Sequence, residues 1–325
     1  MNLINKKDKI FVAGHNGMVG SSVVRNLRLC GYNNIITSSK EKLDLRDQDQ
    51  VRKWFHANSP EIVILAAAKV GGIFANDSFP TEFLLDNLKI QNNVIEISWQ
   101  KKVKRFLFLG SSCIYPKFSE QPIKEESLLS GYLEPTNESY ALAKISGIKL
   151  CQSLREQYNF DAISLMPTNL YGTGDNYHPL NSHVMPALIR KFHEAKVNNF
   201  KEVVCWGSGS PMREFLHVDD LGKACIFALE NWDPDTNDAS KDQFGKVLTY
   251  LNVGTGKDIS IKNLALLIAE IIGYEGSIAW DLDKPDGTPK KLLDISRIQK
   301  LGWAPNLSIR EGISMTIKEF QNLSS

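Results

Sequence analysis

The feature that most constrains the fold of this 325-residue chain is a glycine-rich turn between a short strand and a helix. Residues 9–13 form an apolar run, and residues 21–29 have helical character. The turn consists of Gly14, His15, Asn16, Gly17, Met18, Val19 and Gly20. Glycines three residues apart let the backbone approach a pyrophosphate, which then lies at the helix N-terminus. The turn therefore predicts dinucleotide binding; the alternative is a turn that only packs the helix on the sheet.

After this turn, strand and helix patterns alternate along the chain. Apolar runs near 34–38, 61–68, 105–109 and 161–166 predict buried strands, and helical periodicity lies between them. Such alternation indicates a parallel sheet with helices on both faces. We therefore expect an α/β fold, a Rossmann-type doubly wound parallel sheet with a smaller C-terminal α/β domain.

The length of the chain allows two domains that share a cleft. The regular alternation weakens after residue 177. We expect residues 1–177 to form the NADP-binding Rossmann domain, with later returns near 214–230 and 249–253. Residues 178–325 are expected to form mainly a substrate-binding domain, in which residues 231–246 are a polar surface insertion.

Charge and cysteine usage argue against several classes of protein. The formal net charge is +1 with both signs mixed, so no nucleic-acid-binding surface is indicated. No apolar run approaches the ~18 residues that a membrane-spanning helix needs. The five cysteines are scattered and odd in number, which indicates a reducing compartment and a cytoplasmic protein. No pair among the six histidines has metal-ligand spacing, so no metal site is expected.

A tyrosine and a lysine four residues apart suggest proton-transfer chemistry. Tyr140 and Lys144 share one face of an expected helix. An ammonium beside a phenol lowers the phenol pKa from about 10, so the tyrosine can transfer a proton near neutral pH. Ser111, at the end of the strand 105–109, can donate a hydrogen bond to the same substrate oxygen. Taken alone, the pair fits a solvated surface pair better; the glycine turn upstream favours catalysis.

The loop after the second strand indicates which cofactor binds. Sites that prefer NAD usually place an acidic residue at this strand's end to take the ribose 2′-hydroxyl. Here the strand ends without one, and Lys40 can pair with a 2′-phosphate. NADP(H) is therefore expected, although Glu41 follows directly and Lys40 can equally be a solvated loop charge. Asp44 and Leu45 are candidates for adenine contacts; Asp44 can alternatively cap the next helix.

The carboxyl ends of two further strands complete the expected cofactor site. In an open parallel sheet, ligands bind beyond these ends. A proline turn is expected after the strand 161–166. The expected cofactor contacts at the two ends are Leu109, Gly110, Ser111, Ser112, Pro167, Thr168, Asn169 and Leu170.

Several short segments, taken in order, carry a resemblance to a known family. They are residues 13–20, 66–72, 110–116, 181–184, 206–209 and 284–289. With them, nearly the whole chain resembles the extended short-chain dehydrogenase/reductase superfamily, and most closely the GDP-L-fucose synthase family. That family often has arginine in the glycine turn where this chain has Asn16, so the expected NADP(H) preference depends on Lys40.

The resemblance implies a two-step reaction on a GDP-sugar. The implied substrate is GDP-4-keto-6-deoxy-D-mannose and the product GDP-L-fucose. Carbons 3 and 5 flank the C4 ketone, so both can epimerise through an enolate before NADPH-dependent reduction. The implied catalytic residues are Ser111, Cys113, Tyr140, Lys144 and His183, of which Tyr140, Lys144 and His183 also contact the cofactor.

Cys113 and His183 are the implied base and acid of the epimerisation. Their ordinary pKa values bracket neutral pH, so one can accept a proton and the other donate one. If the chain stays extended from Ser111 to Cys113, both side chains face the cleft. Without the resemblance, Cys113 is better read as a small buried residue, and His183 as a residue at a helix start.

The resemblance also selects substrate-binding residues. Lys191 and Arg213 are the candidates for gripping a diphosphate, since a guanidinium fork matches phosphate oxygens. Trp206 can stack on the guanine or pack on the sugar, and the alternative is a core tryptophan. Asp286 is a candidate for a sugar or ribose hydroxyl.

The helices expected near 80–101 and 139–158 carry apolar residues on more than one face. The resemblance implies that they form a four-helix bundle in a homodimer; the alternative is packing within one chain. One rival function is a sugar-nucleotide 4-epimerase or 4,6-dehydratase that holds NAD tightly. Another, of a different class, is a catalytically silent NADP-sensing binding protein, although such proteins usually lose the tyrosine–lysine pair.

Overall fold

The computed structural model of the chain describes residues 3–179, 182–284 and 286–324, so Asn181 and Pro285 of the motifs above lie outside the described residues. The strands are β1 (Ile10–Ala13), β2 (Ile35–Ile36), β3 (Ile62–Leu65), β4 (Arg105–Leu109), β5 (Ala162–Pro167), β6 (Asn169–Tyr171), β7 (Glu202–Trp206), β8 (Met212–His217), β9 (Tyr250–Val253), β10 (Asp258–Ser260), β11 (Ser277–Asp281) and β12 (Lys290–Lys291). The helices are α1 (Met18–Leu29), α2 (Gln48–Asn58), α3 (Ile73–Ser78), α4 (Pro80–Gln100), α5 (Glu138–Tyr158), α6 (Val184–Val197), α7 (Val218–Asn231), α8 (Ile261–Ile272), α9 (Ser296–Lys300) and α10 (Ile309–Ser324).

A six-stranded parallel sheet lies at the centre of the fold, in the order β2-β1-β3-β4-β5-β9. Strands β1, β3, β4 and β5 are buried along their whole length, as near-continuous apolar runs are in a sheet covered on both faces. The chain places β2 on one side of β1 and β3 on the other. This reversal is the switch point at which such sheets bind ligands. The expected Rossmann-type fold is confirmed.

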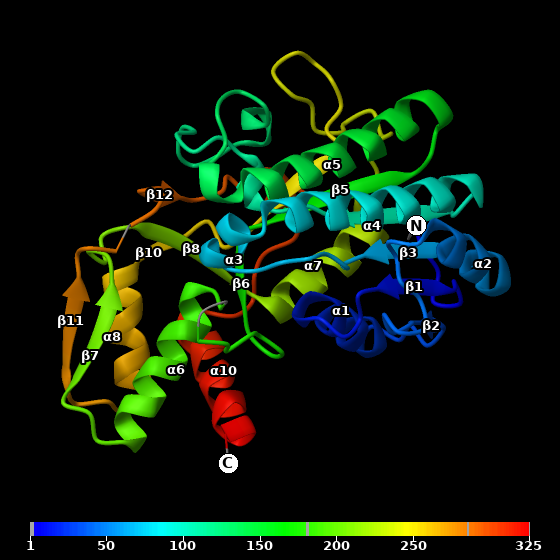
Figure 1. Cartoon of the computed structure of the whole chain (residues 1–325). Coiled ribbons are helices and arrows are strands. Elements are labelled where there is room, and N and C mark those ends of the chain that lie inside the picture. The colour runs from blue at the N-terminus through cyan, green and yellow to red at the C-terminus, as the bar shows by residue number, and fades with distance from the viewer. Residues whose placement is uncertain (1–2, 180–181, 285, 325) are drawn as a thin grey trace.

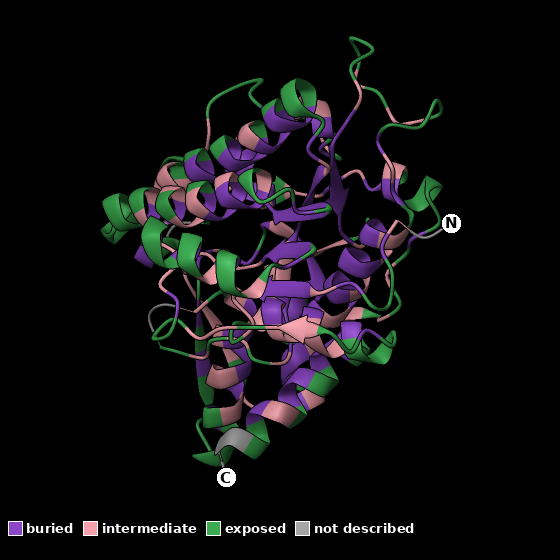
Figure 2. Ribbon diagram, turned by 90° about the vertical axis from the view of Figure 1, so that its right-hand side faces the viewer, coloured by how far each residue is buried: buried purple, intermediate pink, exposed green. Residues whose placement is uncertain are grey.

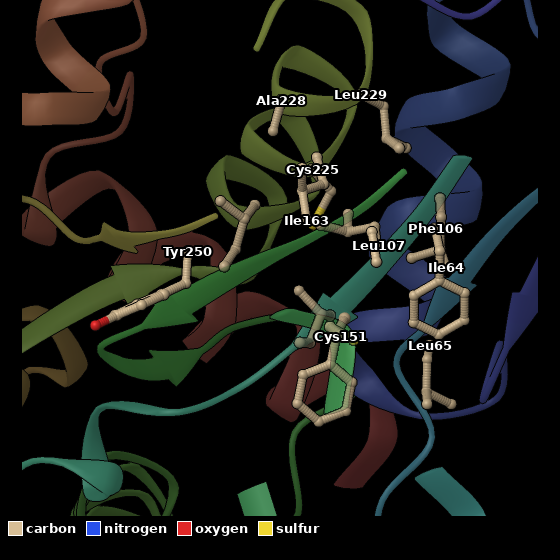
Figure 3. Packing of buried hydrophobic residues seen from close by; sticks show 14 of the residues in the cluster. Ile64, Leu65, Phe106, Leu107, Cys151, Ile163, Cys225, Ala228, Leu229 and Tyr250 are labelled. Atoms are coloured by element: carbon tan, nitrogen blue, oxygen red, sulfur yellow. The ribbon is translucent and has the colours of Figure 1, made fainter. Parts of the chain in front are cut away.

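Helices cover both faces of this sheet (Figure 1). Helices α4 and α5 pack together on one face, and α1 and α7 pack together on the other. Figure 3 shows Cys225 and Ala228 of α7 on one side of β5 and Cys151 of α5 on the other. The sheet is therefore held rigidly, and the positions of its carboxyl ends are fixed.

The second part of the fold is built around β8. This strand pairs with β10, β12 and β6, while β7 and β11 form a separate parallel pair. Helices α6, α8 and α10 contribute to a second hydrophobic cluster. Figure 2 shows buried strands inside and exposed residues along the outer faces of the helices. None of the helices in the described ranges has the length and apolar character needed to cross a membrane.

Candidate active site

The glycine turn joins β1 to α1 through two close backbone contacts. Gly14 has φ +90°, and a Cβ atom there would lie 2.6 Å from the backbone nitrogen of Ala67. A Cβ at Gly20 would lie 2.1 Å from the carbonyl oxygen of Gly14. A Cβ at Gly17 would meet only that oxygen, at 3.5 Å. Packing therefore requires Gly14 and Gly20, whereas Gly17 lies on the open side of the turn.

The open side of this turn has the properties of an anion site. Asn16 and Gly17 are exposed, and Gly17 is the N-cap of α1 without a side-chain hydrogen bond to the helix. Met18 and Val19 are in the first turn of α1, where backbone N–H groups have no acceptor within the helix and can donate hydrogen bonds to a phosphate. The buried Nδ1 atom of His15 has no hydrogen-bond partner among the described residues. These residues fit the pyrophosphate of a dinucleotide.

The loop after β2 carries the residues expected on the adenosine side. Lys40 is exposed, as a contact to a 2′-phosphate requires. Asp44 is held by Arg46, whose Nη2 atom lies 2.7 Å from the carboxylate, and this hydrogen bond lowers the pKa of Asp44 to about 2. Arg46 also pairs with Asp86 at 3.3 Å, so its charge is compensated. The alternative role of Asp44 as a helix cap is wrong, because Asp47 caps α2.

We predict that Lys40→Ala weakens NADPH binding roughly tenfold and leaves NADH binding unchanged. The variant loses one charged contact to the 2′-phosphate, which NADH lacks. Dissociation constants from fluorescence titration of both nucleotides check this. Lys42→Ala, at a neighbouring exposed lysine, is the control. An equal loss for both nucleotides would remove Lys40 from the cofactor site.

The connection between β5 and β6 differs from the expected proline turn. Pro167 ends β5, and only Thr168 separates it from β6, which leaves the central sheet to pair with β8. The side chains of Thr168 and Asn169 donate hydrogen bonds to the carbonyl oxygen of Glu214, at 3.3 and 2.8 Å. Leu170, like Leu45 near β2, packs against the central core.

Ser111 and Cys113 follow β4 at the carboxyl edge of the sheet. The expectation of an extended chain between them is wrong, because Ser112–Ile114 form a short 3₁₀ helix. The Ser111 hydroxyl accepts a hydrogen bond from the Cys113 backbone N–H at 3.4 Å, so the turn keeps the two residues together. Leu109, Gly110 and Ser112 are buried, which leaves Ser111 as the accessible side chain of this set of cofactor candidates.

Tyr140 and Lys144 lie one turn apart on α5. The buried Nζ atom of Lys144 donates a hydrogen bond to the carbonyl oxygen of Leu109 at 2.8 Å and lies 5.8 Å from the centroid of the Tyr140 ring. Burial lowers the pKa of Lys144 to about 8 and raises the pKa of Tyr140 above its usual value. The expected lowering of the tyrosine pKa is therefore wrong, because desolvation of the phenol dominates. A protonated phenol suits the role of proton donor.

A small cavity adjoins Cys113. Its lining includes Tyr115, Glu134, Asn137, Thr288 and Lys291. Burial raises the pKa of the Cys113 thiol, and the positive charge of Lys291 is the largest effect that lowers it. Lys291 was not singled out from the sequence. Only its place on β12, in the opposite phase to Lys290, distinguishes it from the many other lysines.

His183 is the N-cap residue of α6, at the start of the second part of the fold. Its side chain is accessible to solvent, while the protein around it disfavours the imidazolium and lowers its pKa. The imidazole is therefore neutral at pH 7 and able to accept a proton.

The four expected substrate-binding residues lie close to one another. The Nζ atom of Lys191 is 5.5 Å from the centroid of a Trp206 ring, and Trp206 is 59% exposed, which rules out the alternative of a core tryptophan. Asp286 accepts hydrogen bonds from the backbone N–H and the hydroxyl of Ser208, both at 2.7 Å. Burial lowers the pKa of Arg213, and the carboxylate of Asp286 opposes this effect. Four separate segments thus supply one cluster.

Comparison with known proteins shows the family to which the chain belongs. The NAD dependent epimerase/dehydratase family matches residues 10–240. The chain is 54% identical to GDP-L-fucose synthase 1 of Arabidopsis thaliana over 96% of this chain and 93% of that one, and 49% identical to GDP-L-fucose synthase of Escherichia coli K12 over 97% of both. A GDP-mannoheptose C4 reductase from Campylobacter jejuni, solved with NADP bound, has a TM-score of 0.87 at 36% identity and covers 98% of this chain and 99% of its own. The chain therefore belongs to the NAD dependent epimerase/dehydratase family, in the group that contains the GDP-L-fucose synthases.

Proposed function

We propose that this protein converts GDP-4-keto-6-deoxy-D-mannose to GDP-L-fucose by 3,5-epimerisation and NADPH-dependent reduction of the C4 ketone. The observation that carries this proposal is the gathering of Ser111, Cys113, Tyr140 and Lys144 at the carboxyl edge of β4. A ketone bound there meets two hydrogen-bond donors and a thiol. The names of its relatives, at 49–54% identity over nearly the whole chain, support the choice of GDP-sugar.

The epimerisation requires a polarised carbonyl, a base and an acid. Ser111 and Tyr140 donate hydrogen bonds to the ketone oxygen, which stabilises the negative charge of the enolate when a proton leaves C3 or C5. Cys113 and His183 remove that proton and return one to the opposite face. The thiolate form of Cys113 can accept the proton from carbon, and the N–H of the neutral His183 imidazole can donate one to the opposite face.

The reduction uses the same oxygen-binding groups. When bound, NADPH would supply the hydride that reduces C4. Tyr140 gives its proton to the oxygen as the alcohol forms, and a phenol whose pKa is raised by burial holds that proton until then. Lys144 holds the end of β4 through its hydrogen bond to the Leu109 carbonyl oxygen. We also assign the nicotinamide ribose to it. The glycine turn and Lys40 hold the pyrophosphate and the 2′-phosphate.

The N-terminal and C-terminal parts of the chain bind different ligands, the cofactor and the GDP-sugar. We assign cofactor binding to residues 1–177, with the returns near 214–230 and 249–253, and substrate binding mainly to residues 178–325. Lys191 and Arg213 grip the diphosphate, Trp206 lies against the guanine or the sugar, and Asp286 takes a hydroxyl.

The test is incubation with GDP-4-keto-6-deoxymannose and NADPH in heavy water. We expect one equivalent of NADPH to be oxidised and deuterium to appear at C3 and C5 of GDP-L-fucose. A 4-epimerase or 4,6-dehydratase with tightly held NAD would consume no added NADPH, and a silent binding protein would consume none and exchange nothing. Either result would refute the proposed function.

We further propose a cytoplasmic homodimer formed through α4 and α5. Leu85 of α4 and Leu142 of α5 are 45% and 42% exposed, which leaves apolar surface for a second copy. All five cysteines are unpaired, in keeping with a reducing compartment. Sedimentation should give twice the chain mass, and a monomer for the Leu85→Lys/Leu142→Lys variant. A wild-type monomer would refute the dimer, and secretion of the protein would refute the location.

A further inference from the structure

Residues 290–292, which follow the motif at 284–289, make backbone hydrogen bonds on both sides. Strand β12 pairs with β8, with Lys291 opposite Arg213. On its other side, the Leu292 N–H donates to the side-chain oxygen of Gln121, and the Leu292 carbonyl accepts from the Ile123 N–H, both at 2.8 Å. The backbone of Lys291 is therefore fixed in position.

The two lysines of β12 have different surroundings. Successive side chains on a strand point to opposite faces. Lys290 is exposed and pairs with Asp258 at 3.3 Å. Lys291 points the other way and is half-buried. Both lysines reach the small cavity that Cys113 lines, but the amine of Lys290 is taken up by Asp258, whereas the charge of Lys291 acts on the Cys113 thiol. In the described part of the chain, Lys291 forms no ion pair with a carboxylate.

Among the charged groups around Lys291, the Cys113 thiolate is the one that most favours its ammonium form. The charge of Glu134 also favours the ammonium of Lys291, but the Glu134 carboxylate lies 3.7 Å from the Lys117 amine and accepts a hydrogen bond from the Thr136 N–H at 3.0 Å. Arg213 repels the ammonium, and burial also lowers the pKa of Lys291. The Cys113 thiolate is the largest effect that keeps Lys291 charged, and Lys291 in turn is the largest effect that favours the thiolate.

We propose that Lys291 is a positioning residue for Cys113: its ammonium, fixed on β12 at the cavity that Cys113 lines, increases the share of Cys113 that is thiolate, the form that removes the proton from the substrate carbon. Lys144 and Tyr140 face the same thiol from α5, but the Lys144 amine is bound to Leu109 and the phenol is neutral. Lys291 therefore supplies the charge that the buried thiol otherwise lacks. The proton-removal step rests on the proposed function; the effect on the thiol does not.

The first test measures the thiol without substrate. The rate of Cys113 alkylation by iodoacetamide is followed against pH by peptide mass mapping, which separates it from the other cysteines. We expect Lys291→Met to move the midpoint to higher pH and to slow alkylation about tenfold at pH 7.5, the effect of one pKa unit. Lys291→Arg should restore most of the rate, and Lys290→Met should match the wild type.

An unchanged Lys291→Met profile in a protein with wild-type melting temperature would overturn the proposal. If Lys291→Met is unstable, Lys291→Arg and Lys291→Gln decide: equal profiles for these two would overturn it as well. The second test follows deuterium exchange at C3 and C5, whose pH profile should shift upward by the same amount as the alkylation profile. A wild-type enzyme that exchanges nothing would refute the proposed function and leave the alkylation result standing.

Discussion

Replacing Tyr140 by phenylalanine is expected to lower the rate of C4 reduction by a factor of about 10²–10⁴. The variant keeps the ring, which packs edge-on against Phe83 at 6.3 Å between centroids, and loses only the phenolic proton and its hydrogen bond. Nucleotide binding should be almost unchanged, because the glycine turn and Lys40 are not affected. The measurement is NADPH oxidation at saturating GDP-4-keto sugar, together with NADPH titration.

A matched control is available for this substitution. Tyr132 is 97% exposed, so Tyr132→Phe makes the same chemical change away from the site and should leave the rate unchanged. Wild-type turnover by Tyr140→Phe would show that another group protonates the ketone oxygen. Loss of NADPH binding in parallel with the loss of rate would instead show that Tyr140 positions the cofactor.

Cys113→Ser is expected to suppress hydrogen exchange at C3 or C5 by a factor of about 10²–10⁴, with a much smaller effect on reduction of a substrate that is already epimerised. A hydroxyl in a buried position ionises far less readily than a thiol and cannot replace it as an acid or base near neutral pH. Deuterium incorporation from heavy water measures the first step, and NADPH oxidation with the epimerised ketone measures the second.

The control for this substitution is Cys151→Ser. Cys151 is a buried thiol in the middle of α5 and is not among the proposed site residues, so its replacement tests the general cost of a hydroxyl in place of a buried thiol. Equal losses in exchange and reduction for Cys113→Ser would contradict a specific role in epimerisation. Retained exchange at both carbons would transfer the acid–base role to other residues.

The sequence predicts those features that depend on residues close to one another along the chain. Gly14 and Gly20 follow from spacing, because a strand, a tight turn and a helix in succession leave no room for side chains. The runs at β1 and β3 are apolar throughout, and those at β4 and β5 are apolar except for Arg105 and Ser164, as in a sheet that is covered on both faces. Tyr140 and Lys144 share a helix face for the same local reason. The Rossmann-type sheet was therefore predictable.

The pKa values and charge partners of the site residues could not be predicted from the sequence. The pair spacing of Tyr140 and Lys144 suggested a lowered phenol pKa, but the spacing says nothing about the carbonyl of Leu109 that takes the lysine amine, or about the burial that raises the phenol pKa. Asp44 was similarly open to several roles until Arg46 was seen to occupy its carboxylate. Desolvation depends on the whole surrounding fold, not on adjacent residues.

By itself, the sequence determined the order of strands and helices, the glycine turn and the identity of the groups able to carry protons. Only the tertiary structure decided that a 3₁₀ turn keeps Cys113 beside Ser111, and that Lys291, far along the chain, faces the same cavity. The physical reason is that alternation along a strand determines which face of β12 carries Lys291. The pairing of β12 with β8 determines that this face lies at the cavity of Cys113. That pairing joins segments about eighty residues apart, and no local pattern encodes it.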